Sequence, residues 1–336
     1  MEKKNKAEVQ LILKSNAVNW EEVVKVSTSH YVFPALYCNY KRAKFLKYLP
    51  TDLVDYMKYI TDLNRNRNKK IIEQAKKLNC LLLNNDIRPI FLKGTANLLL
   101  GLYEDIAERM LGDIDFLFSE NDFVKAINIL NNDNYRIHEN QLDYFKGFRH
   151  HSRMIKNHNI AAVEIHKEVI IEKYRDEFSC EMIKNNTQII NEYSFPSFEN
   201  QLSISIISSQ INDYGFELKN FPLRNAYDVF LLSKKVDAKM AISKFNNLRI
   251  PLNCFLANCN LFFGDLETLE YFKTKETVKY LKAFKKFGNK RKSNFKTNIK
   301  LLIINFRRRL VIVFKSIFNS ENRKWILKRI KRKIRI

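Results

Sequence analysis

FLKGTANLLLGLYEDIAERMLGDIDFLF, residues 91–118, is the stretch that decides the fold. An apolar run leads into a Gly-Thr step, and a later apolar run carries two aspartates separated by one residue. The pattern predicts a strand, a turn, a helix and a second strand, with Gly94 and Thr95 where the helix begins. Backbone N–H groups at such a turn are suited to bind a phosphate group.

The second strand of this stretch has two chemically different faces. Asp113 and Asp115 are two residues apart, so both carboxylates leave the same face of the sheet. Ile114, Phe116 and Phe118 take the opposite face, and we expect them to enter a core. Two like charges on one face repel each other unless a cation lies between them, and Mg²⁺ is the simplest candidate. The spacing indicates, in outline, a two-metal site for phosphoryl or nucleotidyl transfer.

A likeness to a known family rests on the same residues. LKG, the aromatic Tyr103, Arg109 and the run GDIDFLF resemble the nucleotidyltransferase superfamily, whose signature is a Gly-Ser-like turn followed by Asp-x-Asp. The closer likeness is to a family of bacterial nucleotidyltransferases with the pattern LKG…Y…R…DIDLL, and Thr95 keeps a hydroxyl in the turn. The resemblance covers roughly residues 20–265. It implies an α/β (α+β) fold, with a mixed-sheet nucleotidyltransferase core and helical segments flanking it on both sides.

A third carboxylate comes later in the chain. NHN at residues 157–159 predicts a hairpin turn, and the strand after it alternates so that Glu164 and His166 share one face. The resemblance places Glu164 on a strand beside the Asp-x-Asp strand, as the acid for a second metal ion. His166 matches the EIH pattern of the resembled family and is a candidate contact for phosphate or acceptor. An exposed strand acid is the plain structural alternative for Glu164.

Basic side chains lie close to these acids in the sequence. Lys93 precedes the glycine of the turn, and Arg109 comes four residues before the first aspartate. Either one is suited to neutralise a triphosphate, although Arg109 is equally suited to a structural anchor. His151 and Arg153 open the strand before the hairpin and, being two residues apart, face together. We interpret this pair as a further candidate contact for phosphate or acceptor.

Length and amino-acid composition limit the kinds of protein that this chain can be. The chain has 336 residues, 46% of them hydrophobic, which indicates a folded protein with a sizeable core. Only 7 glycines and 6 prolines favour a helix-rich chain. The 5 cysteines show no metal-binding spacing, so we expect reduced thiols and no disulfides. The N-terminal sequence lacks the apolar core of a signal peptide, and we expect the protein to stay on the cytoplasmic side.

The chain divides into four segments by pattern. Residues 1–85 read as amphipathic helices, and residues 86–195 as the nucleotidyltransferase core of alternating strands and helices. Residues 196–281 return to helical periodicity. Residues 282–336 form a basic amphipathic tail outside the family resemblance.

The tail carries most of the positive charge. It has 20 lysines and arginines and a single acid, Glu321, so it supplies +19 of the net +23. No apolar run reaches the ~18–20 residues of a spanning helix. We therefore expect an interfacial helix that binds the anionic inner face of the membrane, with the apolar side chains inserted being Trp325, Ile326, Ile330 and Ile334. A nucleic-acid-binding arm and a solvated extension are the alternatives.

The function expected is transfer of a nucleoside monophosphate from an NTP to an unidentified acceptor, with release of pyrophosphate. Two Mg²⁺ ions, with Mn²⁺ as the alternative, would be held by Asp113, Asp115 and Glu164. The expected nucleotide contacts are Lys93, Gly94, Thr95 and Arg109. The resemblance implies a surface-polysaccharide or related pathway. Three other classes stay open: an RNA-modifying nucleotidyltransferase, a non-catalytic binding protein with this fold, and a metal-dependent glycosyltransferase, which leaves Glu164 unexplained.

Overall fold

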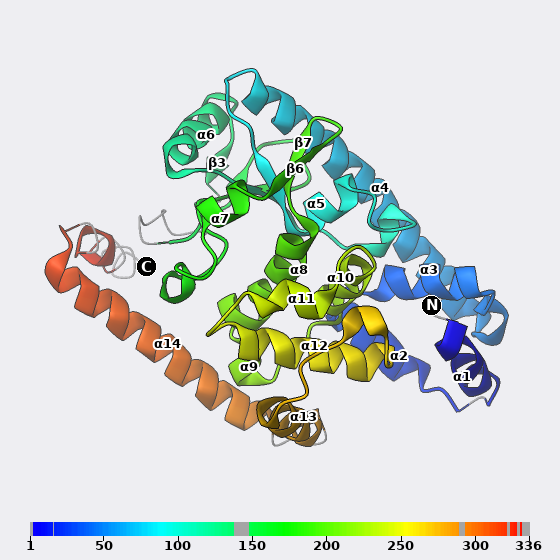
Figure 1. Cartoon of the computed structure of the whole chain (residues 1–336). Helices are drawn as coiled ribbons and strands as arrows, with labels where there is room; N and C mark the ends of the chain where they lie inside the picture. The colour runs from blue at the N-terminus through cyan, green and yellow to red at the C-terminus, as the bar shows by residue number, and fades with distance from the viewer. Residues whose placement is uncertain are drawn as a thin grey trace.

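The computed structural model describes residues 3–15, 17–137, 148–288, 293–320, 323–327 and 330. Within these residues, seven short strands form one mixed sheet with helices packed on both faces (Figure 1). A mixed sheet with helical flanks is the fold class that the sequence predicts, and that prediction is confirmed. All of the described strands lie between residues 90 and 196.

The strand order places the predicted acidic strands at the middle of the sheet. The order is β3-β4-β5-β2-β1-β7-β6, and the central strand β2 runs parallel to β5 and antiparallel to β1. β4 and β5 form the antiparallel hairpin expected around residues 157–159. The strands are β1 Ile90–Leu92, β2 Asp113–Leu117, β3 Arg136–Ile137, β4 Met154–Ile155, β5 Ala162–His166, β6 Thr187–Ile190 and β7 Tyr193–Pro196.

Helices precede, interrupt and follow the strands. The first group comprises α1 Lys3–Lys14, α2 Trp20–Ser29, α3 Phe33–Ala43, α4 Thr51–Leu83, α5 Lys93–Leu99, α6 Glu120–Asn132 and α7 Cys180–Lys184. After the sheet come α8 Phe198–Ile207, the π-helix η4 Ser208–Asn212, α9 Gly215–Leu218, α10 Leu223–Ser233, α11 Ala238–Ser243, α12 Arg249–Phe263, α13 Lys275–Gly288 and α14 Ser293–Phe318. Short 3₁₀ turns are η1 Leu46–Tyr48, η2 Ile106–Glu108, η3 Glu172–Tyr174 and η5 Glu267–Leu269.

One face of the sheet is covered by α4 and α6. The side chains of Ile114, Phe116 and Phe118 enter this core, as the alternation of β2 predicts. Phe116 packs on Phe91 of β1 with ring centroids 4.8 Å apart. From α4, residues at helical spacing complete the layer, including Ile71. Fully burying one such side chain stabilises the fold by about 1.5–3 kcal/mol, so this layer holds β2 firmly in place.

The opposite face of the sheet packs against the C-terminal helices. Leu92 and Leu117 share one apolar core with α8, α10 and α12, in which Ile206 and Phe255 are fully buried. The helices after residue 196 therefore complete the core of the sheet. Their packing also brings α10 close to the loop that precedes β2, which matters for the site described below.

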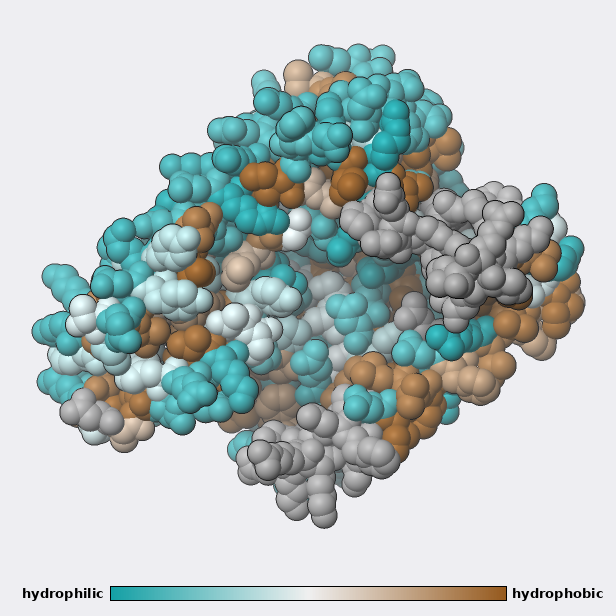
Figure 2. Space-filling model, turned by 180° about the vertical axis from the view of Figure 1, so that it is seen from behind, coloured by the Kyte–Doolittle hydropathy of each residue, from teal (hydrophilic) through white to brown (hydrophobic). Residues whose placement is uncertain are grey.

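The helix α14 lies along the outside of the molecule (Figure 1), and the side chains described on it are mostly exposed. Seen from behind, its hydrophobic side chains gather in a strip beside a hollow of the surface (Figure 2). Further along, the Trp325 ring meets that of Phe148 with centroids 5.8 Å apart. No helix among the described residues is long and apolar enough to cross a membrane. Ile334 lies outside the described residues.

Candidate functional site

The register between β2 and β5 places the predicted acids side by side. Asp115 is directly beside Glu164, and Asp113 is beside Ala162. Because paired residues of parallel strands project to the same side, Asp113, Asp115 and Glu164 share one face of the sheet. His166, two residues after Glu164, projects to that face as well. The carboxylates predicted from sequence are therefore brought together by a single strand pair.

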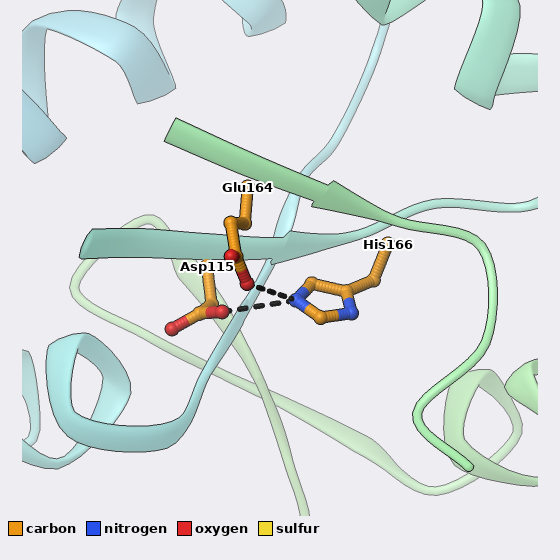
Figure 3. A group of neighbouring side chains, drawn as sticks. All are labelled: Asp115, Glu164 and His166. Atoms are coloured by element: carbon orange, nitrogen blue, oxygen red, sulfur yellow. Dashed lines mark hydrogen bonds and ion pairs between the residues drawn. The ribbon is translucent and has the colours of Figure 1, made fainter. Parts of the chain in front are cut away.

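The side chains of Asp115, Glu164 and His166 converge (Figure 3). His166 Nε2 lies 2.9 Å from Asp115 Oδ1 and 3.4 Å from Glu164 Oε2. The His166 side chain is completely buried, and Asp115 and Glu164 are 7% and 8% exposed. Carboxylates this deeply buried need positive partners, because an isolated buried charge is very costly.

Two basic side chains reach these acids. Lys93 Nζ lies 2.6 Å from Asp115 Oδ1 and 3.8 Å from Glu164 Oε2. Arg153 joins the other edge of the cluster, with Nε 2.8 Å from Glu164 Oε1 and Nη2 2.9 Å from Asp113 Oδ2. Lys93 also has a left-handed backbone, with φ at 54°. Such a conformation costs a non-glycine residue about 1–3 kcal/mol and is concentrated at functional sites.

The three carboxyl groups differ in how readily they ionise. Burial alone would raise the pKa of Asp115, but the Lys93 ammonium and a hydrogen bond with His166 outweigh it and lower that pKa. Burial is outweighed in the same way at Glu164, whose pKa is held below its usual value by His166 and Lys93. At Asp113 burial and the nearby Glu164 carboxylate raise the pKa to about 6, against the opposing charge of Arg153. Asp113 is therefore the acid most easily protonated.

The Gly-Thr step begins α5 immediately after β1, as the sequence predicts. A Cβ on Gly94 would lie 2.5 Å from Leu111 Cδ2 and 3.2 Å from Arg109 Cζ, so only glycine fits without displacement. The Thr95 side chain is buried, and its hydroxyl donates to the carbonyl oxygen of Asp113 at 3.2 Å. The step therefore fixes α5 against the start of β2. Phosphate binding by its backbone N–H groups stays a prediction.

Arg109 is bound to the C-terminal helices. Its guanidinium Nε and Nη2 each lie 3.0 Å from a carboxylate oxygen of Asp228 on α10. The Tyr103 hydroxyl donates to Asp228 Oδ1 at 2.6 Å. Arg109 is 6% exposed and Asp228 is 2% exposed, so the pair is buried. This arrangement matches the structural alternative stated for Arg109, and its contact with a nucleotide stays a prediction.

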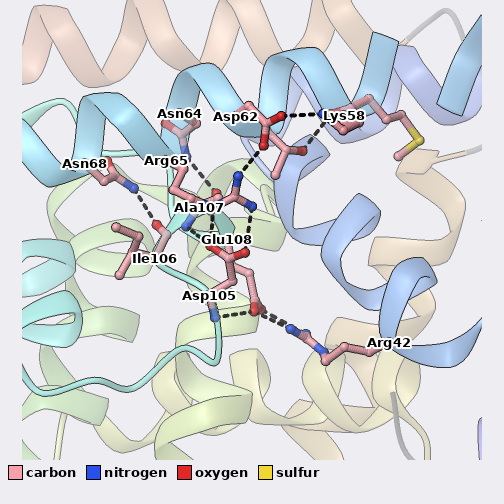
Figure 4. A network of polar contacts seen from close by, with 12 residues as sticks. Arg42, Lys58, Asp62, Asn64, Arg65, Asn68, Asp105, Ile106, Ala107 and Glu108 are labelled. Carbon is pink, nitrogen blue, oxygen red and sulfur yellow. Dashed lines mark hydrogen bonds and ion pairs between the residues drawn. The ribbon is translucent and has the colours of Figure 1, made fainter. Parts of the chain in front are cut away.

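A polar network holds the loop before β2 against α3 and α4 (Figure 4). Asn64 Nδ2 donates to the carbonyl of Ala107 at 2.7 Å, and Asn68 Nδ2 donates to that of Ile106 at 2.6 Å. The buried Glu108 carboxylate accepts from Arg42 Nη1 at 2.6 Å. Because α4 also packs on the sheet, the network positions the start of the acidic strand.

The residues before β5 only partly follow the sequence prediction. Arg153 reaches the carboxylates, as described above, whereas His151 is 7% exposed with its Nδ1 2.9 Å from the Ser152 carbonyl oxygen. β4 begins only at Met154, so strand alternation does not apply to His151. Its predicted contact with phosphate or acceptor stays untested. The neighbouring His150 instead packs on His166, with ring centroids 5.1 Å apart.

Two further ionisable residues lie near the site: His150, beside the predicted pair, and Asp213, which sequence reasoning missed. Burial and the nearby His166 lower the pKa of His150 to about 4, so its ring is neutral at pH 7. Asp213 follows the π-helix η4, and loss of hydration raises its pKa while Arg149 and Lys93 oppose the rise. A π-helix often marks a functional site. Asp213 carries no spacing signal, because an irregular segment brings it near the cluster.

The donor atoms suit a divalent cation. One ligand atom each from Asp115, Glu164 and His166 lies within 4.8 Å of the others. Carboxylate oxygens and an imidazole nitrogen are ordinary ligands for divalent ions. The cluster thus contains two of the three predicted metal ligands, with His166 rather than Asp113 as its third member. The Asp113 carboxylate lies at the Arg153 edge of the same face.

A mixed sheet that presents carboxylates from two adjacent strands, beside a buried Gly-Thr step, has the features expected of a nucleotidyltransferase core. The chain belongs to a family of uncharacterised nucleotidyltransferases, whose model matches residues 16–263. No curated protein and no solved structure shows significant similarity to the chain. The family resemblance predicted from the sequence is confirmed, and it supports nucleotidyl transfer from an NTP as the activity. The matched region ends before α13 and α14.

Proposed function

We propose that this protein transfers a nucleoside monophosphate from an NTP to a hydroxyl or phosphate acceptor and releases pyrophosphate. The observation that carries the proposal is the placement of Asp113, Asp115 and Glu164 on one face of two adjacent strands. Basic side chains on both sides of these acids supply the positive charge that a triphosphate requires. Family membership supports the reaction class.

Asp113, Asp115 and Glu164 are the residues that we propose to hold two Mg²⁺ ions, or Mn²⁺ in their place. When bound, such ions supply charge neutralisation and Lewis-acid polarisation of the phosphoryl group. His166 and Lys93 keep the Glu164 carboxylate ionised, so that it could hold the acceptor-side ion and, through that ion, help to orient and activate the acceptor. His166, beside it, and His151 are proposed to contact the acceptor or a phosphate group.

The positive groups are proposed to bind the NTP. Lys93 and Arg153 lie against the carboxylates and are close enough to meet a phosphate group bound there. The backbone at Gly94 and Thr95 borders the same face and is the proposed cradle for the β- and γ-phosphates. Arg109 would add positive potential from behind this turn. Positioning and electrostatics carry most of the rate in such a transfer, so no covalent nucleophile is needed.

The test is calorimetric titration of ATP, CTP, GTP and UTP into the full-length protein, with and without Mg²⁺. We expect Mg²⁺-dependent binding of at least one nucleotide, and we expect Asp115→Asn and Glu164→Gln to weaken it at least tenfold. The matched control is Asp133→Asn, which removes a carboxylate paired with Lys156 away from the cluster. Melting curves check that each variant is folded. Absence of nucleotide binding in every condition would refute the transferase proposal and favour a non-catalytic binding protein.

We further propose that α14 binds the anionic cytoplasmic surface of the membrane, which would place the acceptor in a surface-polysaccharide or related pathway. A stripe of eight apolar side chains at helical spacing runs along α14, and each is between 41% and 68% exposed. The stripe consists of Ile299, Leu302, Ile303, Phe306, Leu310, Val313, Phe314 and Ile317. Exposed apolar area of this extent marks an interaction surface.

The basic residues beside this stripe favour an anionic lipid surface as its binding partner. At 3.6 residues per turn, Arg307 and Arg309 lie about 80° to either side of the centre of the stripe, and both are exposed. Basic residues at the edges of an apolar stripe are typical of helices that lie in a membrane interface. Each basic residue near an anionic surface contributes about 1 kcal/mol of binding.

Vesicle sedimentation tests the membrane proposal. We expect the protein to bind vesicles that contain phosphatidylglycerol and not those of phosphatidylcholine alone. Phe306→Glu on the stripe should abolish binding. Val311→Glu, which adds the same charge at an exposed position outside the stripe, should retain it. Binding to RNA without binding to anionic vesicles would contradict the proposal and favour the RNA-modifying alternative.

A further inference from the structure

The ammonium group of Lys93 touches three different donor atoms of the acidic cluster. Its Nζ lies 2.6 Å from Asp115 Oδ1, 3.4 Å from His166 Nε2 and 3.8 Å from Glu164 Oε2. One positive charge therefore lies against two carboxylate oxygens and an imidazole nitrogen at once. This is the environment of a bound cation.

His166 Nε2 has the spacing of a neighbouring metal ligand from one oxygen of each carboxylate, and all three ligand atoms lie within 4.8 Å of one another. His166 Nε2 is 2.9 Å from Asp115 Oδ1 and 3.4 Å from Glu164 Oε2. Neighbouring ligands about 2.1 Å from an octahedral ion are about 3 Å apart. Little rearrangement of the protein atoms would be needed for one ion to contact all three residues. The ion would then lie where the Lys93 ammonium now lies.

The imidazole of His166 cannot satisfy all of its present neighbours. Nε2 can donate a hydrogen bond to Asp115 or accept one from Lys93, but a single ring nitrogen cannot do both. His166 Nδ1 has no hydrogen-bond partner among the described residues, so no hydrogen bond on that side sets the tautomer. A divalent ion would use the Nε2 lone pair and both carboxylates together. The fully buried imidazole is therefore suited to bind a cation through Nε2.

We propose that His166 is a direct metal ligand together with Asp115 and Glu164, and that Lys93 occupies the ion's position until the ion displaces it. This inference rests on the proposed function and names the metal class at that site. It assigns His166 to the ion in place of the acceptor or phosphate contact proposed above. An imidazole ligand favours first-row transition ions over Mg²⁺, which prefers oxygen ligands. The site therefore selects an ion such as Mn²⁺ in preference to Mg²⁺.

Displacement of Lys93 couples metal loading to nucleotide binding. The ion replaces a single positive charge with a double one between two carboxylates, so the local charges then balance. The displaced ammonium remains on the same flexible side chain beside the Gly-Thr step. There it is available to a phosphate group of the NTP. Metal and nucleotide would consequently bind with positive cooperativity, each favouring the displaced position of Lys93.

The experiment titrates Mn²⁺ into the full-length protein without nucleotide, following free Mn²⁺ by electron paramagnetic resonance, with Mg²⁺ as competitor. Electron spin-echo modulation of the bound Mn²⁺ in the wild-type protein should show a directly coordinated ¹⁴N nucleus. His166→Gln should lose that signal, bind Mn²⁺ at least tenfold more weakly and lose preference over Mg²⁺. Absence of the nitrogen signal from bound Mn²⁺ in the wild type would overturn the assignment of His166 as a ligand.

Two variants test whether the metal ion and the Lys93 ammonium compete for the same position. Lys93→Met should tighten Mn²⁺ binding at least tenfold. Arg153→Met also removes a positive charge beside Glu164. The Arg153 guanidinium, however, contacts Glu164 Oε1, whereas Lys93 lies near Oε2, so the increase in Mn²⁺ affinity should be much smaller. Equal increases in Mn²⁺ affinity in the two variants would mean that only the removal of a positive charge matters and that Lys93 does not occupy the ion's position. Because nucleotide is absent, these outcomes are distinct from those of the NTP titration.

Discussion

Arg109 and Asp228, separated by 119 residues in the chain, form a buried ion pair between the loop before β2 and the helix α10. Two guanidinium nitrogens of Arg109 contact the carboxylate of Asp228, and the Tyr103 hydroxyl donates to the same group. The Asp228 charge outweighs burial and raises the pKa of Arg109, so the guanidinium stays charged. It ties the helices after the sheet to the loop that positions the acidic strand.

Loss of one partner from this pair should be strongly destabilising. Asp228→Asn leaves the Arg109 charge buried without its counter-charge, which typically costs about 3–5 kcal/mol of unfolding free energy. Urea denaturation measures this loss. The half-exposed pair of Asp133 and Lys156 is the matched control, and Asp133→Asn should cost far less. Equal losses in the two variants would contradict a stabilising role for the buried pair.

A methyl group at Gly94 should disturb the turn that begins α5. The added Cβ would lie 2.5 Å from Leu111 Cδ2 and 3.2 Å from Arg109 Cζ, and Arg109 is held in its ion pair. Such overpacking costs about 1–3 kcal/mol, and it should also weaken NTP binding. Gly112→Ala is the control, because among the described residues beyond its chain neighbours no atom lies within 4 Å of where its methyl group would be. Thermal unfolding and nucleotide titration of both variants provide the comparison.

The metal-free protein should become more stable when Asp113 cannot ionise. The folded-state pKa of about 6 lies above the ordinary 3.8, so the folded state binds more protons between these values and loses stability as pH rises. Asp113→Asn should therefore exceed the wild type in stability by up to about 3 kcal/mol at pH 8, with the difference vanishing near pH 4. Denaturation across this range, with divalent ions removed, measures it. A difference that does not change with pH would contradict the elevated pKa.

The contribution to stability of the polar network that holds the loop before β2 should depend mainly on its buried residue, Glu108. Glu108 is 2% exposed and accepts hydrogen bonds from Arg42 and from the Tyr227 hydroxyl. Glu108→Ala removes the buried acceptor of both donors and leaves Arg42 paired with the exposed Glu104 carboxylate, so it should cost about 1–3 kcal/mol. Lys58→Ala removes an exposed partner of Asp62 from the same network and should change stability little. Chemical denaturation of both variants tests whether burial decides the contribution.

The sequence predicts the site best where the contacts are local. The period of two along a strand places Asp113 and Asp115 on one face of β2 and Phe116 on the other, and the structure has that arrangement. The same rule does not apply to His151, because β4 begins only at Met154, and the predicted contact of His151 stays a prediction. The neighbouring His150 packs on His166, a contact set by an isolated antiparallel bridge between two segments.

The sequence alone determined which residues form the acidic face, because alternation along a strand and the glycine of a turn are properties of neighbouring residues. Only the tertiary structure decided how these pieces meet. The β2–β5 register sets Asp115 beside Glu164, and the packing of α10 gives Arg109 its partner Asp228. Such contacts join residues far apart in the chain, and their formation depends on burial of both apolar faces of the sheet. No local pattern encodes that pairing.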